Sequence, residues 1–275
     1  MTAPHSSPQS LPDTQAEQDK RNLMIDKAGI KDLRYPFIFA AQAATQPTVG
    51  IWSMYVGVPA TEKGTHMSRF LECLDAMVQN GQALGLKDFV ALEADMRQRL
   101  DTAITGNISV RFPLFVRKEA PVSKVTSFLD YDITISVTTR PEHTGLLSLN
   151  VRVPVKSLCP CSKNISEYGA HNQRSNIIID VDLTPDVESV AIERLIRLAE
   201  EEATCEVYGL LKRADEKWVT ERAYENPKFV EDTVRDVALR VQALPYVKRF
   251  RVAAENFESI HNHSAYAEIE GTGRG

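Results

Sequence analysis

Hydrophobic residues recur along this chain with the spacing of strands in some segments and the spacing of helices in others. The order of these segments predicts the order of its secondary-structure elements. Segments 48–58, 108–118 and 125–139 are rich in β-branched and aromatic residues, and DYDITISV alternates strictly, so each predicts a strand. After the first strand, HMSRFLECLDAMVQN and KDFVALEADMRQRLDTAI carry apolar residues at helical spacing and predict two helices. Before residue 48 the candidate for a further strand is RYPFIFAAQ, residues 34–42.

The second half of the chain repeats this order. Strands are expected over 146–155 and 175–183, and the capping signal TPDVE then opens an amphipathic helix over 187–212. A further helix is expected from Pro227 to residue 244, because proline is tolerated at a helix start. Segments 248–258 and 264–271 predict the last two strands.

The order β-β-α-α-β-β written twice predicts an α+β fold with antiparallel sheets and helices on one face. We expect a disordered tail over 1–20, rich in Ser, Pro and Gln, a first module over 21–142 and a second over 143–275. Such sheets have open edges, which chains cover by pairing with copies of themselves. A homo-oligomer with pockets between subunits is therefore expected.

Composition narrows the classes of function. The chain of 275 residues is 43% hydrophobic and 25% charged, and its net charge of −5 argues against a general binder of nucleic acid or anionic membranes. It has no apolar run of roughly 20 residues and no signal-peptide pattern, so we expect a cytoplasmic protein with reduced thiols. Cys73 and Cys205 lie in helix-like patterns and are interpreted as packing residues.

The stretch SLCPCSKNISEYGAHNQRS, residues 157–175, carries the candidate chemistry. Cys159 directly follows one predicted strand and His171 directly precedes the next, so pairing of the strands would bring the two side chains together to share a metal. A catalytic metal site normally needs about three protein ligands, so a third is sought among Glu216, Glu231 and Glu258. Glu216 falls in a connection of 14 residues between two predicted helices. As an alternative, one cysteine could act as a thiolate nucleophile without a metal. A structural zinc module is disfavoured, because the CPC triplet fits no zinc-ribbon or zinc-finger spacing.

Two further groups are weaker candidates. HNH at 261–263 places His261 and His263 at alternate positions of a segment entering a strand, so they are expected to point to opposite sides. In EKGTHMSRF, Lys63, His66 and Arg69 surround a predicted helix start, which suits an anion such as phosphate. The chain has no P-loop or Rossmann motif.

Four motifs together closely resemble GTP cyclohydrolase type IB of folate biosynthesis: SLCPCSKNISEYGAHNQRS, EKGTHMSRF, LKRADEKWVTERAYENPKFVED and FESIHNHSAYA. The resemblance spans residues 20–270. It implies the tunnelling fold (T-fold), in which β-β-α-α-β-β modules form barrels, and a homotetramer with active sites at subunit interfaces. The implied reaction converts GTP and water to 7,8-dihydroneopterin triphosphate and formate.

The resemblance also implies roles for individual residues. Cys159, His171 and Glu216 look like ligands of a divalent metal, which is zinc, manganese or iron, with Cys161 as a neighbour that assists. Glu231 looks like the carboxylate that binds guanine through two N–H groups. His261, with Glu258 nearby, looks like an acid/base group. Lys63, His66, Arg69 and Arg174 are the candidates for the triphosphate.

Two other functions compete with this assignment. A nitrile reductase of the same fold would use Cys159 or Cys161 as a covalent nucleophile and would need neither His171 nor Glu216. A binding assembly without catalysis would hold a purine or pterin on Glu231 and use the metal for structure alone. A structural metal site would more naturally have four protein ligands, which disfavours this last alternative.

Overall fold

The computed structural model describes residue 15 and residues 17–41, 44–79, 81–101, 104–185, 187 and 189–274. Its strands form one sheet in the order β10-β9-β7-β6-β5-β4-β2-β1-β3, and β8 pairs with β6 beside this path. All neighbours are antiparallel except the short pair β1 and β3. The strands are β1 Ile25–Ala40, β2 Thr45–Val58, β3 Ala83–Leu84, β4 Gly106–Glu119, β5 Thr126–Arg140, β6 His143–Leu158, β7 Asn172–Leu183, β8 Cys205–Glu206, β9 Val247–Asn256 and β10 Ala265–Thr272.

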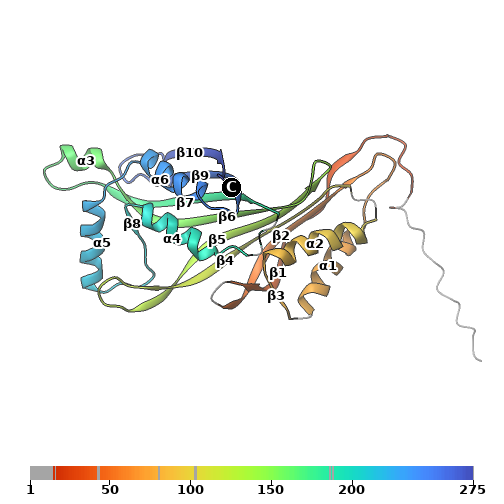
Figure 1. Ribbon diagram of the computed structural model, residues 1–275, viewed down its shortest axis with the longest axis horizontal. Coiled ribbons are helices and arrows are strands. Elements are labelled where there is room, and N and C mark those ends of the chain that lie inside the picture. The colour runs from red at the N-terminus through yellow and green to blue at the C-terminus, as the bar shows by residue number, and fades with distance from the viewer. Residues whose placement is uncertain are drawn as a thin grey trace, which may run out of the picture.

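The helices lie along one side of this sheet, and Figure 1 shows them in two groups. One group lies near β1 and β3, and the other lies near β6 to β10. The α+β class with helices on one face is therefore confirmed. The helices are α1 Met67–Gln79, α2 Leu86–Arg99, α3 Pro160–Ile165, α4 Ile192–Glu202, α5 Arg213–Glu225 and α6 Val230–Gln242.

Strand order in the sheet follows the two halves of the sequence. The neighbours β1, β2, β4 and β5 come from the first half, and β6, β7, β9 and β10 come from the second. β5 pairs directly with β6 through the turn at residues 141–142, and this pairing joins the halves. The strands of the two halves therefore belong to one hydrogen-bonded sheet.

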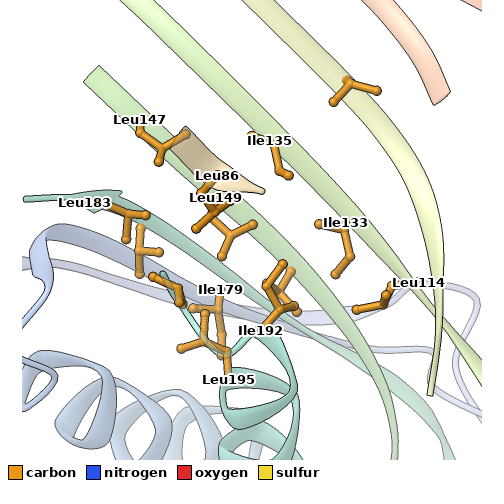
Figure 2. Packing of buried hydrophobic residues seen from close by; sticks show 14 of the residues in the cluster. Leu86, Leu114, Ile133, Ile135, Leu147, Leu149, Ile179, Leu183, Ile192 and Leu195 are labelled. Atoms are coloured by element: carbon orange, nitrogen blue, oxygen red, sulfur yellow. The ribbon is translucent and has the colours of Figure 1, made fainter. Parts of the chain in front are cut away.

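One hydrophobic core runs across this junction. Leu114, Ile135, Leu149 and Ile179 project from β4, β5, β6 and β7 on the same face of the sheet, and Leu195 of α4 packs beside Ile179 (Figure 2). These strands alternate buried and less buried positions along their length. The alternation seen in the sequence therefore marks the face that packs against helices.

β1 begins nine residues before the predicted strand at residue 34. The earlier part, IDKAGIKDLR, mixes charged residues with glycine and contains irregular pairing with β2. Asp32 adopts a left-handed backbone with φ of 56° there, and its N–H donates to the hydroxyl of Ser53. The bulged register interrupts the alternation that would have indicated a strand. Of the predicted segment, residue 42 lies outside the described residues.

The helices of the second half also differ from the expectation. α4 ends at Glu202 rather than residue 212, because Cys205 and Glu206 leave the helix to pair with β6 as β8. Residues 213–225, expected as a connection, form α5 instead. α6 begins at Val230, three residues after Pro227.

Part of the expected N-terminal tail is hydrogen-bonded to the body. Gln18 forms an isolated bridge with Glu62, and the N–H of Asp19 donates to the carbonyl of Thr61. The rest of the expected tail, residues 1–14 and 16, lies outside the described residues. Within the described ranges, no helix is both long and apolar enough to cross a membrane.

Candidate active site

Cys159 sits at the junction of a strand and a short helix. β6 ends at Leu158, Cys159 is the N-cap of α3, and Pro160 occupies the first helical position. The Sγ of Cys159 accepts from the backbone N–H of Ser162 at 3.5 Å. Its half-buried thiol is thus directed toward the helix start, whereas Cys161 is exposed on α3.

The chain returns to Cys159 at His171, as the strand pattern predicts. β6 and β7 are paired up to Leu158 and Asn172, and the N–H of Cys159 donates to the carbonyl of His171 at 3.2 Å. Ser162 links the two residues, because its hydroxyl donates to the carbonyl of Cys159 at 3.1 Å and accepts from the N–H of His171 at 3.2 Å. The expected proximity of Cys159 and His171 is confirmed.

Two acceptors face the imidazole of His171. Its Nδ1 lies 3.1 Å from Oε1 of Gln173 and 3.6 Å from Oε2 of Glu258. Both ionisable side chains are largely shielded, with 13% of His171 and 11% of Glu258 exposed. Glu258 is held next to β7 because the N–H of Phe257 donates to the carbonyl of Arg174. The loop after β9 therefore brings a carboxylate to the Cys159–His171 pair.

Glu216 does not join this group. It is exposed in the first turn of α5. Among the described residues, no three or more His, Cys, Asp or Glu side chains gather closely enough to hold a metal ion. In the single chain, the structure brings together two of the three predicted ligands.

The neighbouring Asp215 anchors α5 to the hairpin between β4 and β5. Its fully buried carboxylate accepts from the N–H groups of Val122, Ser123 and Lys212, each at 2.8 Å, and from the Ser123 hydroxyl at 2.5 Å. Burial alone would raise the pKa of Asp215, but these hydrogen bonds outweigh it and hold the pKa well below its usual value of 3.8. Asp215 therefore fixes the end of the helix that carries Glu216.

Asp215→Asn is expected to lower the thermal unfolding midpoint by roughly 5–10 °C at neutral pH. The amide would place N–H groups against backbone donors that need an acceptor. Because the folded-state pKa lies below the unfolded one, the carboxylate stabilises the fold fully above about pH 4 and loses this effect as the pH falls further. The difference between wild type and variant, followed by circular dichroism, should shrink accordingly in acid.

Asp88→Asn is the matched control, because Asp88 also occupies the third position of a helix and accepts from the N-cap N–H, at 2.7 Å from Gly85. Asp88→Asn therefore measures the effect of losing a helix cap alone, which lowers the stability of the fold by about 1 kcal/mol. Equal midpoint shifts for the two variants would contradict the tertiary role of Asp215.

The remaining candidates of the second half lie exposed. Glu231 is in the first turn of α6. His261 and His263 lie in the loop between β9 and β10, and their rings stack at 5.2 Å between centroids with 22° between planes. The expectation that they point to opposite sides is wrong, because the two rings stack on each other. Residues two apart in a strand share a face, and here the strand itself begins only at Ala265.

The basic candidates of the first half are distant from this site. Lys63, His66 and Arg69 surround the start of α1, and α1 and α2 lie at the opposite end of the molecule from α3 and α5 (Figure 1). Lys63 pairs with Glu17 at 2.6 Å, and Arg69 donates to the carbonyl of Arg99 at 2.8 Å. By contrast, Arg174 is exposed on β7, three positions after His171.

Sequence reasoning missed several residues that shape the site. Ser162 bridges Cys159 and His171, and Gln173 faces the His171 ring. The spacing held weak signals for both: Ser162 is at the third helical position after an N-cap, and Gln173 is two positions from His171 at the start of a strand.

Comparison with solved structures defines the fold class. The chain is similar to uricase from Arthrobacter globiformis, with a TM-score of 0.52 and 9% identity over 95% of each chain. It is similar to a uricase from Bacillus fastidious, with a TM-score of 0.56 and 7% identity over 90% of this chain and 93% of that one. At such low identity the likeness shows a shared fold alone. The chain is therefore an α+β protein of uricase-like architecture.

Sequence comparison defines the family. Residues 11–267 match the family model described as Type I GTP cyclohydrolase folE2. GTP cyclohydrolase FolE2 1 of Dechloromonas aromatica is 55% identical over 95% of this chain and 96% of its own, and GTP cyclohydrolase FolE2 of Burkholderia multivorans is 54% identical over 94% of each. The chain belongs to the type I GTP cyclohydrolase FolE2 family. Family membership confirms the resemblance and favours the cyclohydrolase over the reductase and the binding assembly.

Proposed function

We propose that this chain converts GTP and water to 7,8-dihydroneopterin triphosphate and formate, the first step of folate biosynthesis. The observation that carries the proposal is the Cys159–His171 pair, backed by Glu258 and Gln173, in a chain of the FolE2 family. Hydrolytic opening of a purine ring needs an activated water and groups that move protons, and this arrangement supplies candidates for both.

The Cys159–His171 pair fits a divalent metal in its donor chemistry. A thiolate and an imidazole suit zinc, manganese or iron, and a metal-bound histidine typically offers its other ring nitrogen to a carboxylate or carbonyl. Here Gln173 and Glu258 face Nδ1 and leave Nε2 for the metal. Glu216 is the proposed third ligand, although it stands apart from the pair in this chain. When bound, the metal would lower the pKa of a water that attacks C8 of guanine.

In this proposal, side chains of the protein bind the guanine base and transfer protons. Glu231 accepts from N1–H and the 2-amino group of guanine, which fixes the base. His261 and Glu258 exchange protons with the opened ring, since an imidazole titrates near neutral pH. Cys161, exposed two positions after Cys159, assists at the metal.

Triphosphate binding is assigned to Lys63, His66, Arg69 and Arg174, and the first three lie at the far end of the chain from Cys159 (Figure 1). This separation supports active sites between subunits of a homotetramer, formed by tandem T-fold modules over 21–142 and 143–275. The edge at β10 and the side of β1 that β3 covers at Ile38 and Phe39 alone, within the described residues, support such an assembly. A cytoplasmic location stays a prediction.

Metal-depleted protein incubated anaerobically with GTP should release formate after addition of Mn²⁺, Zn²⁺ or Fe²⁺. Formate and the fluorescence of the oxidised pterin should rise together, because both arise from the same ring opening. Bound GTP that yields neither product with any of the three metals would overturn the hydrolase and favour a binding assembly. Size-exclusion chromatography with light scattering tests the tetramer in the same samples.

A further inference from the structure

A small apolar cluster lies apart from the main core, at the end of the molecule that carries α3 and α5 (Figure 1). Leu158, Cys205 and Ala223 are its buried members, and the partly buried Ala170 and Val219 pack against them. The five residues come from the end of β6, from β8, from α5 and from the loop before β7. We call them the satellite cluster.

The satellite cluster touches every segment that carries a proposed metal ligand. Leu158 immediately precedes Cys159, and Ala170 immediately precedes His171. Val219 and Ala223 follow Glu216 by three and seven positions, so all three lie on one face of α5. Packing within the cluster thus fixes how far apart these segments lie and how α5 is rotated.

Cys205 occupies the position that joins the segments. It lies opposite Lys156 in the pairing of β8 with β6, and 3% of it is exposed. Burial raises the pKa of its thiol to about 11, so the side chain stays neutral and acts as a small apolar group. The amide of Asn226 donates to the carbonyls of Ala203 and Thr204, which ties the end of α5 to the turn before β8.

We propose that Cys205 is a positioning residue: through the satellite cluster it sets the placement of Cys159 and His171 relative to α5. The proposal rests on the proposed metal site. It explains why a buried cysteine packs with the neighbours of the candidate ligands without being a ligand itself. A neutral thiol held by apolar neighbours contributes shape alone, and one missing sulfur atom would let the Cys159 and His171 segments shift.

The test is an anaerobic Co²⁺ titration of the full-length, metal-depleted chain, because thiolate coordination produces a near-ultraviolet charge-transfer band independently of turnover. Cys205→Ala should weaken Co²⁺ binding about 10- to 100-fold, the usual effect of disturbing the support of a metal site. Cys205→Val refills the volume with a residue that favours strands, so it should restore most of the affinity.

Cys73→Ala is the matched control, because Cys73 is a thiol in the main core with 1% exposed and with its pKa also raised by burial to about 11. It should lower the thermal midpoint and leave the Co²⁺ band and affinity unchanged. Should Cys205→Ala fail to fold, Val219→Ala removes bulk from the same cluster at a half-buried position and should weaken binding likewise.

The outcomes separate the two proposals. If wild type binds Co²⁺ without the thiolate band, the metal site fails and the positioning role fails with it. If wild type shows the band and the alanine variants at Cys205 and Val219 bind Co²⁺ as tightly, the positioning role alone is overturned.

Discussion

Cys159→Ser is expected to abolish metal-dependent formate release from GTP while helix α3 stays folded. Cys159 has two jobs in the structure and the proposal: its Sγ caps α3 by accepting from Ser162, and its thiolate is a metal ligand. Serine is a strong N-cap residue but a poor ligand for a soft metal site. The variant should therefore still cap α3 but no longer bind the metal. Losing several kcal/mol of transition-state stabilisation corresponds to roughly 10³-fold or more in kcat.

Cys159→Ala removes both the cap of α3 and the metal ligand. Comparing it with Cys159→Ser therefore separates the effect of the cap from that of the ligand. The alanine variant should lose formate release equally and also lower the thermal midpoint, because the α3 cap is gone. Cys161→Ser removes the neighbouring thiol, which is proposed to assist and not to ligate the metal, so it should lower formate release less than Cys159→Ser does. Formate release near the wild-type rate by Cys159→Ser would rule out the thiolate as an essential ligand.

Sequence pattern predicts the sheet well where one face of a strand is buried. β4, β5, β6 and β7 alternate over most of their lengths, and each was expected within three residues of its observed start. The same alternation placed Cys159 and His171 at the ends of paired strands, and the pairing was confirmed. This part of the site follows from strand register alone.

The hydrophobic pattern of the sequence does not predict a helix that is stabilised mainly by tertiary contacts. α5 buries only Asp215 and Ala223 among its residues, so it has no apolar stripe to indicate a helix. Its anchors are the hydrogen bonds of Asp215 to the β4–β5 hairpin and the bond from Lys163 to the carbonyl of Tyr224 at 2.6 Å. Both anchors join residues far apart in sequence, which periodicity cannot detect.

For β8, the pattern predicts a helix where the structure has a strand. ATCEVYGLL continues the amphipathic pattern of α4, and helical propensity alone would extend the helix through Cys205. In the structure Cys205 and Glu206 pair with Lys156 and Val155 of β6. Burial of Cys205 in the satellite cluster and hydrogen bonding to β6 outweigh the local preference.

Glu231→Gln is expected to lower kcat/KM for GTP by roughly 10²- to 10⁴-fold. The proposed role of Glu231 is to accept two hydrogen bonds from guanine, and each bond to a charged acceptor is worth roughly 1.5–3 kcal/mol. Because Glu231 is exposed on the first turn of α6, its replacement should leave the thermal midpoint close to that of wild type. The defect should therefore be one of recognition and not of folding.

Inosine triphosphate sharpens this test, because it lacks the 2-amino group that Glu231 is proposed to bind. Wild type should prefer GTP over inosine triphosphate in kcat/KM, and Glu231→Gln should narrow that preference, since the variant has lost the charged acceptor. Asp232→Asn is the matched control: it neutralises the next carboxylate of the same helix turn, which pairs with Arg235 at 3.3 Å. It should keep the wild-type preference, and if it narrows the preference as much as Glu231→Gln, the loss reflects charge at the start of α6 rather than a direct contact with guanine.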